Sequence, residues 1–235
     1  MTQEKLARLS TPLSVLAAGI LIGGAVLWNG NHPSAPTTPT AGGQPPSAQT
    51  ADISKVKTAG EPFVGNPNAP ITIAYWFDYQ CPFCKQNEET AMPQLMADYV
   101  NTGKVKVVFK DFQFLGPDSQ MLGQTARAVW DVAPDKFYAW HKAVYDNQGK
   151  ENTGWATQAE ITSITQGVLG AADTKKVLAL VKTNGAVYQK EIDADKAEGN
   201  GFGVNATPSF VIGKQLVVGA VPYSQIQAAI AAASK

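Results

Sequence analysis

The chain has 235 residues, and its 19 Lys and Arg residues are balanced by 19 Asp and Glu residues, so the formal net charge is zero. A chain of this charge lacks the excess of positive charge that binding to nucleic acid or to an anionic membrane surface requires. The hydrophobic fraction of 44% is that of an ordinary globular protein, and the length allows one domain, or one domain with an insertion.

The N-terminal segment has the composition of a membrane-spanning helix. Lys5 and Arg8 precede an uncharged apolar run that ends at Trp28. Residues 11–28, taken as one helix, span about 27 Å at about 1.5 Å per residue, which is slightly short for a bilayer core. We expect an uncleaved transmembrane anchor at 11–28. The alternative is a signal peptide that is removed, although Val26-Leu27-Trp28-Asn29 offers no small-x-small cleavage site.

Both interpretations carry the body of the protein out of the cytoplasm. The next basic residue after the apolar run is Lys55, so the positive-inside rule places residues 1–10 in the cytoplasm and the remainder outside. The segment therefore predicts a membrane-anchored protein whose folded part lies in the periplasm or at the outer face of the cell membrane. A secreted protein is the alternative.

Residues 29–60 are predicted to form a disordered linker. Five prolines lie among Thr, Ala, Gly, Ser and Gln residues between positions 33 and 46. Such a stretch has too little apolar surface to offset the entropy lost on ordering. The folded body is therefore expected at 61–235.

The first part of the body has the pattern of a β-α-β unit. A short strand at 63–64 and a turn precede a buried strand at 71–77, which is rich in β-branched and aromatic residues. The next segment is a helix whose buried face is marked by Met92, Leu95, Met96, Tyr99 and Val100. Pro93 should kink this helix, and a second strand follows at 104–112. The order favours parallel pairing of the two longer strands.

The second part of the body begins with a long helical stretch at 118–199. Glycine and proline turn signals divide it into helices at 121–132, 135–146, 158–169 and 174–197. A β-hairpin is predicted at 209–218, and a last helix runs from Pro222 to the C-terminus.

Cys81-Pro82-Phe83-Cys84 lies between the strand at 71–77 and the helix, and it contains both cysteines of the chain. This position places Cys81 at a helix N-terminus, where free N–H groups and the helix dipole stabilise a thiolate. Cys84 follows one turn later, so the two can form a disulfide, which is the arrangement for thiol–disulfide exchange. We expect Cys81 to be the exposed thiolate that attacks or is attacked. The less exposed Cys84 should resolve the mixed disulfide.

Other roles for the two cysteines fit the sequence less well. A bridge between them closes almost no loop, so it would stabilise the fold little. A structural zinc ion needs four ligands, and His32 and His141 lie far away with no ligand spacing. No metal site is therefore expected, and the alternative that stays open is a pair of buried, unreactive cysteines.

Three stretches of the body resemble the DsbA-like thiol-disulfide oxidoreductases. They are 78–85 around the two cysteines, 135–141 with Asn147-Gln148, and 203–210, in this order along the chain. The resemblance covers about 62–230. It implies an α/β protein with a thioredoxin-like fold and an inserted helical domain at about 118–199. The transmembrane helix and the disordered linker predicted from composition would precede this body. It also implies an enzyme that exchanges disulfides with extracytoplasmic proteins and needs no cofactor.

The resemblance assigns a substrate-binding role to Thr207 and Pro208. In thioredoxin-like folds this proline is cis and lies opposite the C-x-x-C motif. A cis bond would expose the backbone of Thr207 beside the nucleophile, where a substrate strand could pair with it. The alternative is an ordinary trans proline at the start of a strand.

Two positions depart from the family. Phe83 stands where the best-known members have a histidine. We expect Pro82 and Phe83 to tune the pair to a less extreme oxidant, because no positive charge lies near the thiolate. Tyr75 stands where an acid often assists proton transfer to the second cysteine. The nearest acid, Asp78, is a candidate for proton transfer, or else a solvated carboxylate at a loop end, and Glu88 is expected on a solvated helix face.

Three functions are compatible with these features. The leading one is a membrane-tethered oxidase that introduces disulfides into exported proteins and works with a membrane redox partner. The second is a reductase or isomerase that a membrane partner keeps reduced. The third is a non-enzymatic peptide-binding or chaperone module with incidental cysteines. A nucleic-acid partner is not expected.

Overall fold

The structure is a computed structural model that describes residues 49–235. The predicted anchor at 11–28 and the linker as far as residue 48 lie outside the described residues. Among residues 49–235, no helix is both long enough and apolar enough to cross a membrane.

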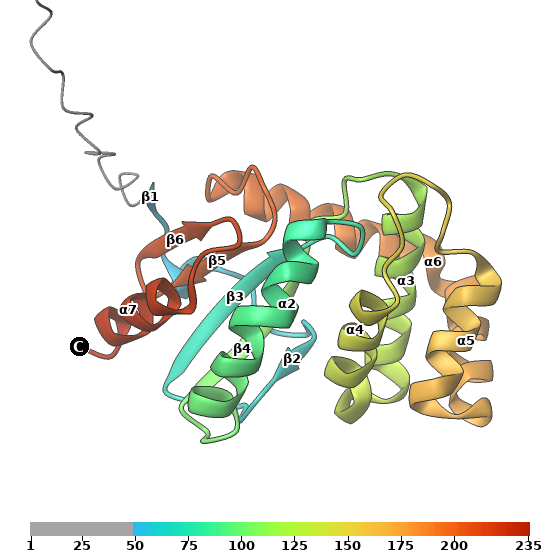
Figure 1. The fold of residues 1–235 in the computed structure, drawn as a ribbon, viewed down its shortest axis with the longest axis horizontal. Helices are drawn as coiled ribbons and strands as arrows, with labels where there is room; N and C mark the ends of the chain where they lie inside the picture. Colours follow the sequence, from blue (N-terminus) through green and yellow to red (C-terminus); the bar gives the residue numbers. More distant parts are fainter. Residues whose placement is uncertain (1–48) are drawn as a thin grey trace, which may run out of the picture. The chain divides into compact units, whose positions relative to one another are not determined.

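A six-stranded sheet in the order β1-β6-β5-β3-β4-β2 forms the centre of the described body (Figure 1). The strands are β1 Gln49–Thr50, β2 Phe63–Val64, β3 Ile71–Phe77, β4 Val105–Asp111, β5 Ser209–Ile212 and β6 Gln215–Val218. The predicted parallel pairing of the two longest strands, β3 and β4, is confirmed, and all other pairs are antiparallel. Residues 73–77 of β3 are all buried, as expected for a strand that is covered on both faces.

Helices cover both faces of this sheet (Figure 1). On one face, α2 (Pro82–Leu95) packs beside α7 (Tyr223–Ala233), and both contribute to the larger core with Ile73, Tyr75 and Phe77. Pro93 does not end α2, which continues as a π-helical turn at Met96–Val100. On the other face, Trp76 donates a hydrogen bond of 3.0 Å from its indole nitrogen to the carbonyl of Asp195 in α6 (Ala171–Gly201). The two faces of β3 therefore belong to two separate clusters of buried side chains.

The helical insertion lies between β4 and β5. It consists of α3 Pro117–Val132, a 3₁₀ turn at Pro134–Lys136, α4 Phe137–Asp146, α5 Gln158–Leu169 and α6. All four predicted helices are present, and the last is longer than expected because it runs through Gly185 and Gly199 without a break. Gly170 separates α5 from α6 with a φ of +83°, a conformation that glycine adopts without steric cost.

The predicted boundary between linker and body is wrong for residues 49–60. Gln49–Thr50 pairs with β6, and a 3₁₀ turn at Ile53–Lys55 follows. Ala51 and Val56 are each only 6% exposed in the smaller core cluster, and Ile53 packs against it. Proline-rich composition ends at Pro46, and the apolar side chains after it bury enough surface to order the chain.

A buried network of charges joins the sheet to the insertion. Arg127 of α3 donates from Nε to Asp111 at 2.8 Å, from Nη1 to Glu61 at 2.6 Å, and from Nη2 to Asp195. Lys110 of β4, fully buried, bonds Asp195 at 2.5 Å and Glu61 at 3.2 Å. Burial raises the pKa of Asp195 to about 7, although the two cations oppose this effect. The network fixes α3 and α6 against β4.

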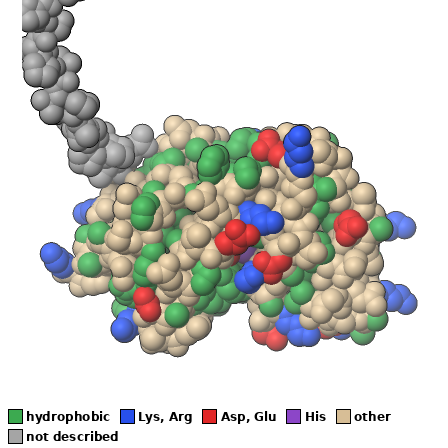
Figure 2. Space-filling view, viewed as in Figure 1, with side chains coloured by type: hydrophobic (Ala, Val, Ile, Leu, Met, Phe, Trp, Pro, Cys, Tyr) green, Lys and Arg blue, Asp and Glu red, His purple; other side chains and the backbone are tan. Residues whose placement is uncertain are grey.

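The molecular surface carries both signs of charge. On the face that Figure 2 shows, Lys and Arg side chains lie next to Asp and Glu side chains, with apolar patches between them. This view agrees with the zero net charge of the sequence.

Candidate active site

Cys81 occupies the N-cap position of α2, as the sequence predicts. Strand β3 ends at Phe77, residues 78–80 turn the chain, and Pro82 is the first residue of the helix. The pKa of Cys81 is lowered to about 6, chiefly because the Cys84 thiol hydrogen-bonds to its sulfur. The side chain of Thr207 and the backbone N–H groups of Cys84 and Phe83 make smaller contributions. Burial opposes this shift. The Cys84 thiol, and to a smaller extent the N–H groups at the helix N-terminus, therefore favour a thiolate at this position.

Cys84 has the opposite environment. Its side chain is fully buried, and burial raises the pKa of its thiol well above the usual range. Both cysteines are free, so the structure describes the reduced form. The two thiols of one motif thus differ strongly in their tendency to ionise.

Cys81 was expected to be exposed, but only 5% of the residue is accessible to solvent. The loop before β5 covers it, and the Cys81 Sγ donates a hydrogen bond of 3.3 Å to the backbone carbonyl of Thr207. Because Ser209 pairs with Trp76 of β3, the antiparallel pairing of β5 with β3 brings this loop to the end of β3 where α2 begins.

The Thr207–Pro208 peptide bond is cis, as the resemblance implies. Pro208 accepts a hydrogen bond of 2.7 Å at its carbonyl from the N–H of Gly219, which fixes the loop to the end of β6. Phe83 on the other side of Cys81 is 60% exposed, and Val218 beside Gly219 is 37% exposed. An exposed apolar side chain thus directly follows the active-site cysteine on α2, and a second one stands on β6, next to the strand that follows the cis-proline.

Asp78 is not solvated, so that part of the expectation is wrong. Its buried carboxylate accepts four hydrogen bonds, from the backbone N–H groups of Gln80, Phe114 and Leu115 and from the hydroxyl of Ser119. Burial raises the pKa of Asp78, although these four donors oppose the effect. The carboxylate anchors the loop before α2 to the loop before α3.

Gln148 was not identified as a site residue from the sequence. Its side-chain amide donates to the carbonyl of Tyr79 at 2.8 Å and to that of Cys81 at 3.2 Å. The signal was present, because Asn147-Gln148 belongs to a stretch that carries the resemblance. This side chain holds the segment after α4 against the start of α2.

The expectation that Glu88 lies on a solvated helix face is wrong, because the residue is only 1% exposed. One of its carboxylate oxygens lies 3.2 Å from the Nε2 atom of the fully buried His141. The helical spacing could have revealed this, because Cys84, Glu88 and Met92 are each four residues apart on the face that packs into the core.

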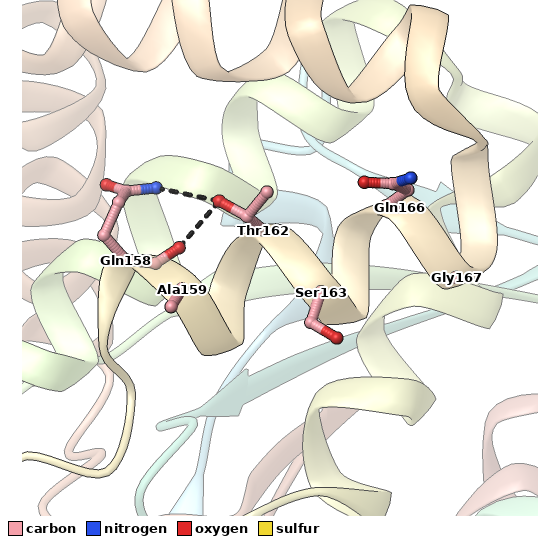
Figure 3. A pocket seen from close by; sticks show the side chains of 6 residues that line it. All are labelled: Gln158, Ala159, Thr162, Ser163, Gln166 and Gly167. Carbon is pink, nitrogen blue, oxygen red and sulfur yellow. Dashed lines mark hydrogen bonds between the residues drawn. The ribbon is translucent and has the colours of Figure 1, made fainter.

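A shallow hollow on the outer surface of α5 lies in the helical insertion and contains neither cysteine. It is lined by Gln158, Ala159, Thr162, Ser163, Gln166 and Gly167 (Figure 3). The Thr162 hydroxyl donates to the carbonyl of Gln158 at 2.6 Å, and the other polar groups are amides and a serine hydroxyl. No thiol or titratable group lines the hollow, so it offers no redox chemistry. Among the described residues, no group of three His, Cys, Asp or Glu side chains is placed to hold a metal ion.

Comparison with known proteins agrees with this site. The model of the thioredoxin family matches residues 57–232, and the chain therefore belongs to this family. Within it, the chain is a DsbA-like thiol-disulfide oxidoreductase.

Two relatives and two solved structures illustrate the similarity. Disulfide bond formation protein D of Bacillus subtilis is 25% identical over 173 residues, which are 73% of this chain and 76% of that protein. A probable disulfide bond formation protein D of Bacillus cereus is 27% identical over 135 residues, 57% of this chain and 62% of the relative. The crystal structure of oxidised BdbD from Bacillus subtilis superposes with a TM-score of 0.70 at 22% identity, covering 79% of this chain and 97% of that one. The thiol-disulfide exchange protein alpha-DsbA2 of Wolbachia pipientis gives 0.64 at 25% identity, with 73% and 86% covered.

Proposed function

We propose that the protein is an oxidase that introduces disulfides into exported proteins, with Cys81 as the exchanging sulfur and Cys84 as the resolving one. The observation that carries the proposal is the lowered pKa of Cys81, at about 6. The thiolate exists only in the reduced protein, so stabilising it favours reduction of the enzyme and makes its disulfide oxidising. A value of about 6 lies well above the ~3.5 of the strongest oxidants of this kind, which supports the expected moderate oxidant.

The reaction follows from the positions of the two sulfurs. A substrate thiolate attacks the Cys81 sulfur of the Cys81–Cys84 disulfide, and Cys84 leaves and takes up a proton. The second thiolate of the substrate then attacks its own sulfur in the mixed disulfide. Cys81 leaves as a thiolate, and two electrons have passed from the substrate dithiol to the enzyme.

Thr207 and Pro208 are proposed to bind the substrate backbone. The carbonyl of Thr207 lies against the Cys81 sulfur, so an extended substrate segment that reaches the sulfur also reaches this acceptor. Phe83, exposed at the start of α2, would offer apolar contact to the same segment. Pro82 removes one N–H at the helix start, and with the neutral Phe83 it sets the redox poise. Asp78 is proposed to assist proton transfer only indirectly, by positioning the loop before α2.

The location and the partners are proposals that rest on the sequence. The apolar segment 11–28 would tether the enzyme to the membrane with its catalytic part outside, and removal of the segment would give a secreted form. A membrane redox partner would then re-oxidise the Cys81–Cys84 pair. The competing function is that of a reductase or isomerase, in which such a partner would keep the Cys81–Cys84 pair reduced. The name of the Bacillus subtilis relative, disulfide bond formation protein D, favours the oxidase.

A glutathione redox titration of the full-length chain in mild detergent tests the direction. We expect a reduction potential above about −200 mV, in the range of disulfide-forming enzymes, together with oxidation of a reduced, unfolded substrate protein. A potential below about −250 mV would assign the protein to the reductases instead. Cys81→Ser should abolish the activity, and a Cys81→Ser protein that remained active would contradict the assigned role.

A further inference from the structure

A buried polar network lies behind the two cysteines, where α2 faces α4. Glu88 accepts from the Tyr138 hydroxyl at 3.2 Å with one carboxylate oxygen, and its other oxygen lies 3.2 Å from His141 Nε2. The Tyr79 hydroxyl lies 3.1 Å from His141 Nδ1. None of these groups takes part in the exchange steps proposed for Cys81 and Cys84.

The donors in this network indicate that Glu88 is a carboxylate. Burial raises the pKa of both Tyr79 and Tyr138, so each keeps its proton and acts as a donor. We assign to His141 the tautomer in which Nδ1 accepts from Tyr79 and the Nε2–H group donates to Glu88. Both oxygens of Glu88 therefore accept, and each retains a free lone pair.

Glu88 lies next to Cys84 on the same face of α2. The two residues are four positions apart, a spacing that places side chains one above the other in a helix. The fully buried hydroxyl of Tyr75 on β3 lies within electrostatic range of both, since after burial itself Cys84 and Glu88 are the main causes that raise its pKa. Tyr75, Cys84 and Glu88 therefore belong to one buried region behind the redox pair.

Polar atoms without partners lie in the same place. The Tyr75 hydroxyl and both polar atoms of the Asn87 side chain are buried and form no hydrogen bond of normal geometry. Asn87 is nevertheless close enough to Tyr75 to lower the pKa of its hydroxyl. Buried polar groups are almost always satisfied, and a small set of them commonly holds an internal water molecule. The site therefore has the chemistry of a proton path rather than of an apolar core.

Formation of the enzyme disulfide requires such a path. Cys84 must lose its proton before it can attack, and it has no direct contact with solvent because it is fully buried. Asp78 is a poor acceptor, since its carboxylate already binds four donors. The family's usual acid is absent, because its position is Tyr75.

We propose that Glu88 accepts the proton of Cys84 when the Cys81–Cys84 disulfide forms, with Tyr75, Asn87 and one bridging water as the path. This inference rests on the proposed roles of the two cysteines. In the mixed disulfide between Cys81 and the oxidising partner, the proton leaves the Cys84 sulfur and Glu88 becomes a carboxylic acid. The Cys84 thiolate then attacks the Cys81 sulfur, the bond to the partner breaks, and the partner leaves as a thiolate.

The surroundings of Glu88 also provide an exit for the proton. The titratable groups that face it are Cys84 on its own helix, Tyr75 on β3, Tyr79 in the following loop, and Tyr138, His141 and Tyr145 on α4. Tyr138 is half-buried and bonded to Glu88, so it connects the carboxylate to the solvent side of α4.

The test separates the two chemical steps of oxidation by stopped flow. The reduced full-length chain is mixed with excess 5,5′-dithiobis(2-nitrobenzoate), whose first coloured thiolate reports attack by Cys81 and whose second reports disulfide closure by Cys84. We expect Glu88→Gln to slow the second phase at least about tenfold at pH 6–7 and to leave the first phase unchanged. The deficit should disappear at high pH, where hydroxide removes the proton. Tyr75→Phe should act in the same direction, and the exposed Glu89→Gln should match the wild type.

Two results for Glu88→Gln would overturn the inference. If its second phase is slowed equally at all pH values, or if both phases are slowed equally, Glu88 only supports the packing of α4. If Glu88→Gln does not fold, an unchanged second phase in Tyr75→Phe overturns it. If the wild type releases no second thiolate, the proposed function itself fails.

Discussion

The Sγ atom of Cys81 donates a hydrogen bond of 3.3 Å to the backbone carbonyl of Thr207. This bond exists only while Cys81 is a thiol, because a thiolate has no proton to donate. The pKa of Cys81 is nevertheless lowered to about 6, because the Cys84 thiol and the N–H groups of α2 donate to the sulfur once the proton leaves. In the thiolate and disulfide forms the carbonyl is therefore free to accept an N–H from a substrate backbone.

The two thiols of the reduced protein should differ in reactivity. Cys81, with a pKa of about 6, should be alkylated by iodoacetamide at a rate that is half-maximal near pH 6. Cys84 should react slowly up to alkaline pH, because burial raises the pKa of its thiol well above the usual range and blocks access. Peptide mass spectrometry after timed alkylation measures both rates, and equal rates would contradict the assigned roles.

The stability of the reduced form should depend on pH between about 6 and 8.5. The pKa of Cys81 is lower in the folded protein than in the unfolded chain, so its contribution to the free energy of unfolding grows as pH rises through this window and is lost as pH falls through 6. The full effect is about 3 kcal/mol. Urea unfolding of the reduced chain and of Cys81→Ser should therefore diverge from pH 6 to 8.5. Parallel pH profiles of the two proteins would show that the thiolate is not stabilised by the fold.

Arg127→Met should destabilise the protein strongly without changing its redox potential. The substitution removes the partner of three buried carboxylates, those of Glu61, Asp111 and Asp195. Breaking a buried ion pair on one side costs about 3–5 kcal/mol. Lys142→Met is the matched control, since Lys142 forms an exposed pair with Asp146 and should change the free energy of unfolding by less than about 0.5 kcal/mol. Similar losses in both variants would contradict this account of the network.

The sequence was sufficient to predict the core of the fold and the position of the redox pair. The β-branched and aromatic run 71–77 forms β3 with the predicted bounds. The C-x-x-C motif follows it after a short turn, so it lies at the start of the next helix. The parallel pairing of β3 with β4 followed from the connecting helix.

The burial of single polar side chains could not be predicted, because it depends on which helix packs over which face of a strand or helix. Lys110 alternates with apolar residues in β4, a pattern that suggests an outward position, but α6 covers that face and the side chain is fully buried. Glu88 and His141 are polar residues on otherwise buried helix faces, and only the packing of α4 on α2 shows that they bind each other. Local patterns do not contain the distances between elements that create such partners.

A chain that begins at Glu61 should be less stable than one that begins at Ser47. The shorter chain lacks Ala51, Ile53 and Val56, whose burial covers Trp76, and the loss should be on the order of 3 kcal/mol. It also lacks the carbonyl of Lys57, which accepts from the buried Lys110 at 3.0 Å. Thermal unfolding of the two chains measures the difference. Equal stability of the two chains would show that residues 49–60 behave as part of the linker, as the sequence predicts.

Phe83→His should lower the pKa of Cys81 below about 6 and make the disulfide more oxidising. The side chain at this position is 60% exposed, so an imidazolium can be accommodated without repacking, and at a few Å it contributes on the order of 1 kcal/mol at such a site. For a two-electron couple, ~1.4 kcal/mol corresponds to ~30 mV. Since an unperturbed histidine titrates near pH ~6.5, the shift in potential should be larger at pH 5.5 than at pH 8.

The matched control for this prediction is Phe83→Asn, which replaces the ring by a neutral polar group of similar reach to imidazole. Glutathione equilibria of the three proteins at the two pH values give the potentials, and thiolate absorbance gives the pKa of Cys81. If Phe83→Asn shifts the potential as much as Phe83→His, loss of the phenyl ring is the cause instead of the added charge. An unchanged pKa in Phe83→His would mean that the Cys84 thiol and the N–H groups of α2 alone set the redox poise of this site.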